Sequence, residues 1–192
     1  MNRNLLIVGN GAFAAIAYEV AEHMGCFEQI DYLYDGMEDA VGTLKDMGRL
    51  SAKYSYAIAA VENAQERMDL TKKLEEFCYR IPILVHPKSH VSKESSLLKG
   101  VIVQSMAVVQ GGATLCNSVF VCAGSVVGSN CFVGDCCTLE FNSIVMPNTI
   151  IQMGTRLPAG TVARENYIAK NDQNARWVRE HIAQFGREPS FF

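Results

Sequence analysis

The chain has 192 residues and a formal net charge of −3, from 17 Lys and Arg against 20 Asp and Glu. Its basic residues form no runs, which excludes the basic surface of a nucleic-acid-binding protein, so no nucleic-acid partner is expected. Apolar residues make up 49% of the chain and charged residues 19%, as in a globular protein. No apolar run reaches the roughly twenty residues of a membrane span, so we expect no membrane insertion and a cytoplasmic location.

The N-terminal region begins with the apolar run Leu5–Val8, which ends in Gly9, Asn10 and Gly11. Apolar positions at helical spacing follow over Ala12–Met24, so the pattern predicts a strand, a tight glycine turn and a helix. Backbone N–H groups at such a helix start can approach a phosphate without obstruction by a Cβ. Gly9, Asn10 and Gly11 are therefore candidate substrate-binding residues. The third glycine of the dinucleotide motif is missing, so a purely structural turn stays open as the alternative.

A second strand is predicted over Ile30–Tyr34, and Asp35 and Gly36 follow it. A dinucleotide-binding unit places its ribose-binding carboxylate at this point, roughly twenty residues after the glycine turn. Asp35 is thus the fourth candidate substrate-binding residue. The pattern then predicts a strand, a helix and a fourth strand over Tyr56–Val61, Ala64–Cys78 and Ile81–Val85. This order is Rossmann-like, and we place this domain at residues 1–87.

An aliphatic residue then recurs at every sixth position for twelve consecutive hexapeptides. A second column, four positions later, prefers small or β-branched residues. Three hexapeptides make one triangular coil of a parallel β-helix, with the aliphatic side chains inside and the small ones near the corners, so about four coils are expected over residues 88–166. The aliphatic column is Val91, Leu97, Val103, Val109, Leu115, Val121, Val127, Val133, Leu139, Val145, Ile151 and Leu157.

Residues 167–192 follow the repeat. Within them, Asn171–Phe185 has apolar positions at helical spacing, including Trp177 and Ile182, which predicts an amphipathic helix that caps the coils.

The chain has seven cysteines, and no pair has the spacing of metal ligands. We expect reduced and mostly buried thiols and no metal site. A catalytic role for Cys136 or Cys137 is the alternative to this packing role.

Four stretches resemble the PglD/NeuD family of sugar acyltransferases. They are Ile7–Gly11, the turn at Asp35, Ile83–Pro87 and Val126–Asp135. The resemblance implies an α/β Rossmann-like domain followed by an all-β left-handed parallel β-helix. It also implies a homotrimer with acetyl-CoA as co-substrate between neighbouring β-helices, and a nucleotide-linked amino sugar held by the N-terminal domain.

Family members commonly use a histidine beside an acidic residue on a mid-helix turn to remove the acceptor's proton. Alignment on Gly134 and Asp135 places Ser129 at the histidine position and Asn130 at the acidic position. Asp135 and Glu140 are the carboxylates that could replace the base, although charged turn residues are usually just solvated. Ser129, Asn130, Asp135 and Glu140 are therefore the candidate catalytic residues.

The four histidines all lie outside the hexapeptide coils, and we assign His86 and His90 to the junction of the domains rather than to catalysis. A γ-type carbonic anhydrase is excluded because its zinc needs three histidines at coil turns.

Two functions remain. The first is acetyl transfer from acetyl-CoA to a nucleotide-linked amino sugar or similar acceptor in bacterial-type glycan biosynthesis, where positioning of an amine can supply much of the rate. The second is a catalytically degenerate trimeric binding or scaffold protein, suggested by Ser129, Asn130, the missing third glycine and a β-helix about one coil shorter than in the family.

Overall fold

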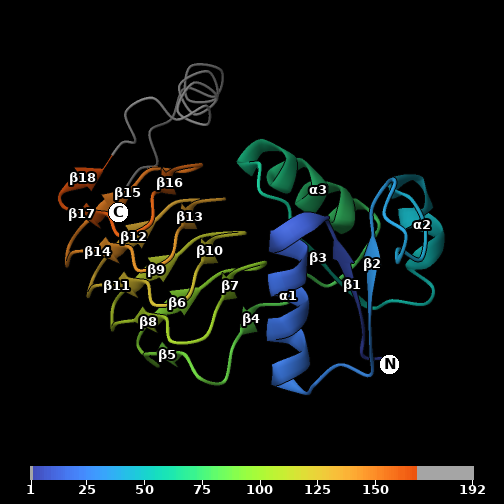
Figure 1. Ribbon diagram of the computed structural model, residues 1–192, viewed down its shortest axis with the longest axis horizontal. Helices are drawn as coiled ribbons and strands as arrows, with labels where there is room; N and C mark the ends of the chain where they lie inside the picture. Colours follow the sequence, from blue (N-terminus) through green and yellow to red (C-terminus); the bar gives the residue numbers. More distant parts are fainter. Residues whose placement is uncertain (1, 168–192) are drawn as a thin grey trace.

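The computed structural model describes residues 2–167, which form an α/β unit followed by a β-solenoid (Figure 1). This confirms the predicted α/β region with a parallel sheet and the predicted solenoid of about four coils. The helix predicted over Asn171–Phe185 lies outside the described residues. Within residues 2–167, none of the helices combines the length and the apolar character that crossing a membrane requires.

The α/β unit is built around a parallel sheet with the strand order β2-β1-β3. Both helices and the first three strands predicted for this unit are present, with ends shifted by at most two residues. The elements are β1 (Asn4–Val8), α1 (Gly11–Met24), β2 (Gln29–Leu33), the short 3-10 helix η1 (Leu44–Asp46), α2 (Met47–Leu50), β3 (Tyr56–Ala59) and α3 (Ala64–Glu76).

Alternating side chains of the strands build a separate core on each face of this sheet. Leu5 and Ile7 of β1 pack with α1 on one face. Leu6 and Val8 pack with α2 and α3 on the other face, beside Leu74. The near-continuous apolar run in β1 is thus explained by burial on both faces of a parallel sheet.

The solenoid consists of three five-stranded parallel sheets made of two-residue strands. The first sheet contains β4 (Leu84–Val85), β7 (Ile102–Val103), β10 (Phe120–Val121), β13 (Thr138–Leu139) and β16 (Arg156–Leu157). The second contains β5 (His90–Val91), β8 (Val108–Val109), β11 (Val126–Val127), β14 (Ile144–Val145) and β17 (Val162–Ala163). The third contains β6 (Ser96–Leu97), β9 (Thr114–Leu115), β12 (Phe132–Val133), β15 (Ile150–Ile151) and β18 (Asn166–Tyr167).

The second residue of nearly every strand points into the solenoid, and from Val103 to Ala163 these side chains are fully buried. This is the aliphatic column predicted from the sequence, and it extends one position further at each end, to Val85 and Ala163. Burial of each large aliphatic side chain contributes about 1.5–3 kcal/mol. Backbone bonds join successive coils, as from Phe120 N to Cys137 O at 2.8 Å.

The fourth strand predicted over Ile81–Val85 is wrong in its length, and the strand that forms is not part of the N-terminal sheet. Only Leu84–Val85 is a strand, and it pairs with Ile102–Val103 of the solenoid instead of the N-terminal sheet. An apolar run predicts a buried strand but not the strand beside it. Val85 occupies the interior column, and this register places Leu84 and Val85 in the first coil.

The α/β unit packs against the outer face of the first solenoid sheet. In Figure 1, α1 lies between the N-terminal sheet and strands β4, β7 and β10. Phe13 of α1 contacts Phe120 of β10, with ring centroids 4.4 Å apart. Ile102 and Phe120 belong to the same buried cluster as Leu5 and Ile7, so α1 joins the two parts through one continuous apolar core.

Candidate functional site

The carboxyl ends of β1, β2 and β3 lie close together around Gly9. Its N–H donates to the carbonyl of Leu33 at 3.3 Å, at the end of β2. A Cβ at this position would lie 2.2 Å from the carbonyl oxygen of Ala60, just after β3. Only glycine allows this approach, so Gly9 has a structural role whatever else it contacts.

The start of α1 is open beside this point. Gly11 has a φ of +65°, and a Cβ placed there would meet nothing within 4 Å. Asn10 is the N-cap residue, but its side chain makes no capping hydrogen bond, and the first turn carries no acidic residue. The N–H groups of this 14-residue helix can therefore receive an anion such as a phosphate. Because β1 has β2 on one side and β3 on the other, this helix start lies at the topological switch point of the sheet, where ligands of such folds bind.

Acidic side chains lie at the end of β2, on the same edge of the sheet. Asp35 is exposed, and its Oδ1 accepts a hydrogen bond from Leu44 N at 2.9 Å. The neighbouring Tyr34 donates its hydroxyl to Glu66 of α3 at 2.5 Å. That hydrogen bond, with burial, raises the pKa of Tyr34 to about 12. The four predicted substrate-binding residues thus follow the ends of the adjacent strands β1 and β2, on one edge of the sheet.

Arg67 of α3 fixes the α/β unit to the solenoid. Its guanidinium is fully buried, which lowers its pKa. Nη1 donates to the carbonyl of Val61 at 2.6 Å, just after β3. From the same side chain, Nε donates to Ser118 O at 3.1 Å and Nη2 to Cys136 O at 2.6 Å. One residue therefore ties the carboxyl end of β3 to equivalent corners of two successive coils of the solenoid.

A second link uses ion pairs at the edge of the same junction. Arg156 of β16 pairs with Glu62, which follows β3, and with Glu140, which follows β13. Glu140 Oε2 also accepts a hydrogen bond from Ala159 N at 3.1 Å. Glu140 is therefore close to the α/β unit, but its carboxylate is already bound by a cation and a backbone N–H.

Ser129 and Asn130 lie together at the corner between β11 and β12. The backbone N–H and the hydroxyl of Ser129 both donate to Gln110 Oε1 at 3.0 Å. Asn130 has a φ of +56°, in the left-handed region that favours Gly and Asn. Gly112 and Asn148 occupy the equivalent corners of the neighbouring coils and also have positive φ values. Turn geometry thus accounts for Asn130.

Asp135 lies at the next corner, between β12 and β13. Its Oδ1 accepts hydrogen bonds from the backbone N–H of Asn117 at 2.8 Å and from the Asn117 side chain at 2.9 Å. Ser129 and Asn130, Asp135, and Glu140 thus occupy three successive corners of the solenoid. The structure does not bring the four predicted catalytic residues into one cluster.

The solenoid cysteines are packed side chains. Cys136 and Cys137 are buried, and burial raises the pKa of the Cys136 thiol to about 11 and that of Cys137 further. A high thiol pKa opposes formation of the nucleophilic thiolate. The expectation of mostly buried thiols is confirmed for five of the seven cysteines, whereas Cys26 and Cys78 are exposed.

The residues that join the two parts carry no signature in the sequence. Arg67 is a charged residue in a helix rich in charged residues, and Arg156 lies on the polar side of a hexapeptide. Neither has a motif or spacing that separates it from solvated neighbours. The weak signal that could have been used is the apolar outer residues of the first sheet, Leu84, Ile102 and Phe120, which indicate that something covers this face.

No protein-family model matches the chain, and no curated protein matches it. Several solved structures match it in fold. Perosamine N-acetyltransferase from Caulobacter crescentus, in a histidine-to-asparagine variant complexed with CoA and GDP-perosamine, aligns with a TM-score of 0.71 and 19% identity over 85% of this chain and 89% of its own. The acetyltransferase domain of PglB from Neisseria gonorrhoeae, complexed with acetyl coenzyme A, aligns with a TM-score of 0.62 and 22% identity over 84% and 96%.

WeeI from Acinetobacter baumannii also aligns, with a TM-score of 0.62 and 15% identity over 83% of this chain and 95% of its own. At these identities the similarity is one of fold, and it extends over nearly the whole length of each matched protein. The chain therefore shares the fold of the PglB acetyltransferase domain, of perosamine N-acetyltransferase and of WeeI, in agreement with the family resemblance of its sequence.

Proposed function

We propose that the protein is an acetyl-CoA-dependent acyltransferase that acts on a nucleotide-linked amino sugar or similar acceptor in bacterial-type glycan biosynthesis. The observation that carries the proposal is the open start of α1 at the switch point of the sheet, beside Asp35. Structures with the same fold include complexes with acetyl coenzyme A and with a GDP-linked sugar.

Backbone N–H groups and a carboxylate at this edge would recognise different parts of a nucleotide sugar. The N–H groups at Asn10 and Gly11 would bind a phosphate, because they lie at the positive end of the helix dipole. Asp35 would accept hydrogen bonds from ribose hydroxyls through the carboxylate oxygen that does not bind Leu44. Gly9 allows the strand ends to close up beneath the ligand.

Acetyl-CoA would lie between neighbouring solenoids of a homotrimer. The second solenoid sheet supports this assembly, because within residues 2–167 the apolar core of the α/β unit packs on the first sheet. Its outward residues from β8 onward are all aliphatic, and Val162 at the end of the row is 43% exposed. Packing of a second copy on such a face would remove this apolar surface from water. The row is Val108, Val126, Ile144 and Val162.

Catalysis would depend mainly on positioning. Ser129, Asp135 and Glu140 each have hydrogen-bond partners, and an amine that is partly neutral can attack a thioester without a protein base. Perosamine N-acetyltransferase forms a complex with CoA and GDP-perosamine after one of its histidines is replaced by asparagine, which supports ligand binding in this fold without that side chain. The hydroxyl of Ser129 and the carboxylates of Asp135 and Glu140 remain the candidate proton acceptors of this chain.

The same contacts favour a second function, a catalytically degenerate binding or scaffold protein. Each predicted catalytic side chain has a place in the turns or ion pairs of the solenoid, which needs no reaction to explain it. The two functions differ in turnover and in the effect of substitutions at the corner between β11 and β12. A large loss of turnover in Ser129→Ala would exclude the scaffold function.

The test is a panel of nucleotide-linked amino sugars with acetyl-CoA. Coenzyme A release should be followed by chromatography, because the exposed thiols of Cys26 and Cys78 would react with colorimetric thiol reagents. We expect release with at least one acceptor and a higher melting temperature in the presence of acetyl-CoA. Release by none of the acceptors, together with an unchanged melting temperature, would refute the enzyme proposal.

A matched pair of variants tests the nucleotide subsite. Asp35→Asn should raise KM for the nucleotide sugar by about tenfold, because one hydrogen bond to a charged group contributes on the order of 1.5 kcal/mol. Asp39→Asn changes a second exposed carboxylate in the same loop and should leave KM unchanged. Equal KM values for the two variants would contradict the assignment of Asp35.

A further inference from the structure

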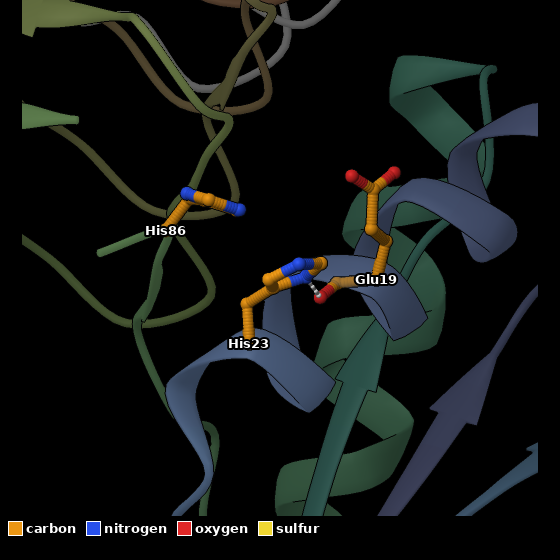
Figure 2. Close-up of side chains that lie close together, drawn as sticks. All are labelled: Glu19, His23 and His86. Carbon is orange, nitrogen blue, oxygen red and sulfur yellow. Dashed lines mark hydrogen bonds between the residues drawn. The ribbon is translucent and has the colours of Figure 1, made fainter. Parts of the chain in front are cut away.

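Two histidines and a glutamate meet where α1 crosses the first coil of the solenoid. Glu19 and His23 lie on α1, and His86 directly follows β4 (Figure 2). One ligand atom from each residue lies within 4.8 Å of the others, and within residues 2–167 this is the one such group of three metal-binding side chains. The two imidazole rings have centroids 4.7 Å apart.

The cluster is separate from the proposed substrate site. His23 lies twelve positions after Gly11 on the same helix, which corresponds to about 18 Å along the axis. Glu19 and His23 are one turn apart, at i and i+4, so their side chains share the face of α1 that meets the first coil. The proposed transfer reaction at the other end of the helix therefore does not use these groups.

The hydrogen bonds of His23 leave one ring nitrogen suited to a metal. Its Nδ1 lies 2.8 Å from the carbonyl oxygen of Glu19, so Nδ1 carries the proton and donates it. The lone pair is then on Nε2. A hydrogen bond from the other ring nitrogen to a backbone carbonyl is the usual support of a metal-binding histidine, because it fixes the tautomer and the ring orientation.

His86 is buried, and its Nδ1 accepts a hydrogen bond from Lys88 N at 3.0 Å. A metal at Nε2 would require the ring proton to move to Nδ1 and this bond to break. The change costs one hydrogen bond, and Lys88 lies in an exposed turn that can adjust. Coordination by three side chains can outweigh the loss of this hydrogen bond. The loss should still limit the affinity for the metal to a moderate value.

We propose that Glu19, His23 and His86 bind a divalent transition-metal ion of the kind that prefers imidazole, such as Zn²⁺ or Ni²⁺. Two imidazoles and one carboxylate are typical ligands for these ions and unsuited to Mg²⁺ or Ca²⁺. Ligand atoms on one metal lie closer together than 4.8 Å, and the exposed side chain of Glu19 can rotate inward while the Nδ1 hydrogen bond of His23 is kept. The bound ion would join α1 to the first coil. This site differs from the sequence expectation of no metal, because Glu19, His23 and His86 come together only in the fold.

The experiment is calorimetric titration of the tag-free, chelator-treated full-length protein with zinc chloride. The background should carry Cys26→Ser and Cys78→Ser, since exposed thiols also bind zinc. We expect one site with micromolar affinity, a melting temperature raised by zinc, and no heat from magnesium chloride. Absence of zinc binding at about 100 µM would overturn the proposal.

The four histidines of the chain provide a matched comparison. His23→Ala with His86→Ala, and His90→Ala with His181→Ala, each leave two histidines in place. The first pair should weaken zinc binding at least tenfold and remove the thermal shift, and the second should change neither. Because His86 is buried, the single variant His23→Ala, at an exposed position, must also weaken binding at least tenfold. Equal affinity in the two double variants, or unchanged affinity in His23→Ala, would refute the site.

Discussion

The solenoid and the α/β unit use their polar residues differently. In the solenoid, polar side chains at the corners bind backbone groups or the corner of the next coil, as Asp135 does with Asn117. In the α/β unit, the carboxyl edge of the sheet leaves Asn10 without a capping bond and the space around Gly11 open. A polar residue in a solenoid corner is therefore weak evidence for catalysis, whereas the open helix start has no structural explanation of its own.

The largest expected effect on stability comes from breaking the contact between the two regions. Arg67→Ala should lower the free energy of unfolding by about 3–5 kcal/mol, because several buried carbonyls lose their donor. Urea denaturation followed by circular dichroism measures this change. The α/β unit should then unfold before the solenoid, so the single transition should split in two.

The control for this variant is Lys73→Ala, which removes an exposed cation from the same helix and should cost less than about 0.5 kcal/mol. A cost below about 1.5 kcal/mol for Arg67→Ala would mean that the apolar contact around Phe13 and Phe120 holds the two regions together without it.

The same contrast explains what the sequence could predict. The six-residue period determines which side chains lie inside the solenoid, so the column from Val91 to Leu157 was predicted without error. In the α/β unit, local patterns located the strands, but they could not identify the partner of Leu84. Asp35 and the glycine turn could be proposed as site residues because a strand end precedes each of them. Arg67 was not found, because its partners are backbone carbonyls far along the chain.

The cysteines allow the two regions to be compared by their rates of alkylation. The exposed thiols belong to the α/β unit and the buried thiols to the solenoid. Iodoacetamide at pH 8 should modify Cys26 and Cys78 at least a hundredfold faster than the solenoid thiols. At that pH about one Cys136 thiol in a thousand is ionised, since its pKa is raised to about 11 by burial. Peptide mass spectrometry of the native protein measures the rates.

The raised thiol pKa values also make the free energy of unfolding depend on pH. The unfolded chain loses these protons near pH 9, whereas the folded chain holds them to about 11 at Cys136 and about 12 at Cys116. The stabilising contribution is therefore complete below pH 9 and declines as the pH rises from 9 to 12. Alkylation of Cys136 as fast as that of Cys78 would show that this part of the solenoid opens readily.

The smallest expected effect on stability is at Asn130, where two substitutions distinguish a role in the turn from a role in the reaction. With a φ of +56°, Asn130→Ala should cost about 1–2 kcal/mol, whereas Asn130→Gly should cost close to nothing. Urea denaturation measures both, and coenzyme A release measures their effect on turnover. If Asn130 serves only the turn, the Gly variant should retain full turnover. Loss of turnover in both variants, with stability kept in Asn130→Gly, would instead place the Asn130 amide in the reaction and give the solenoid corner a role that turn geometry does not explain.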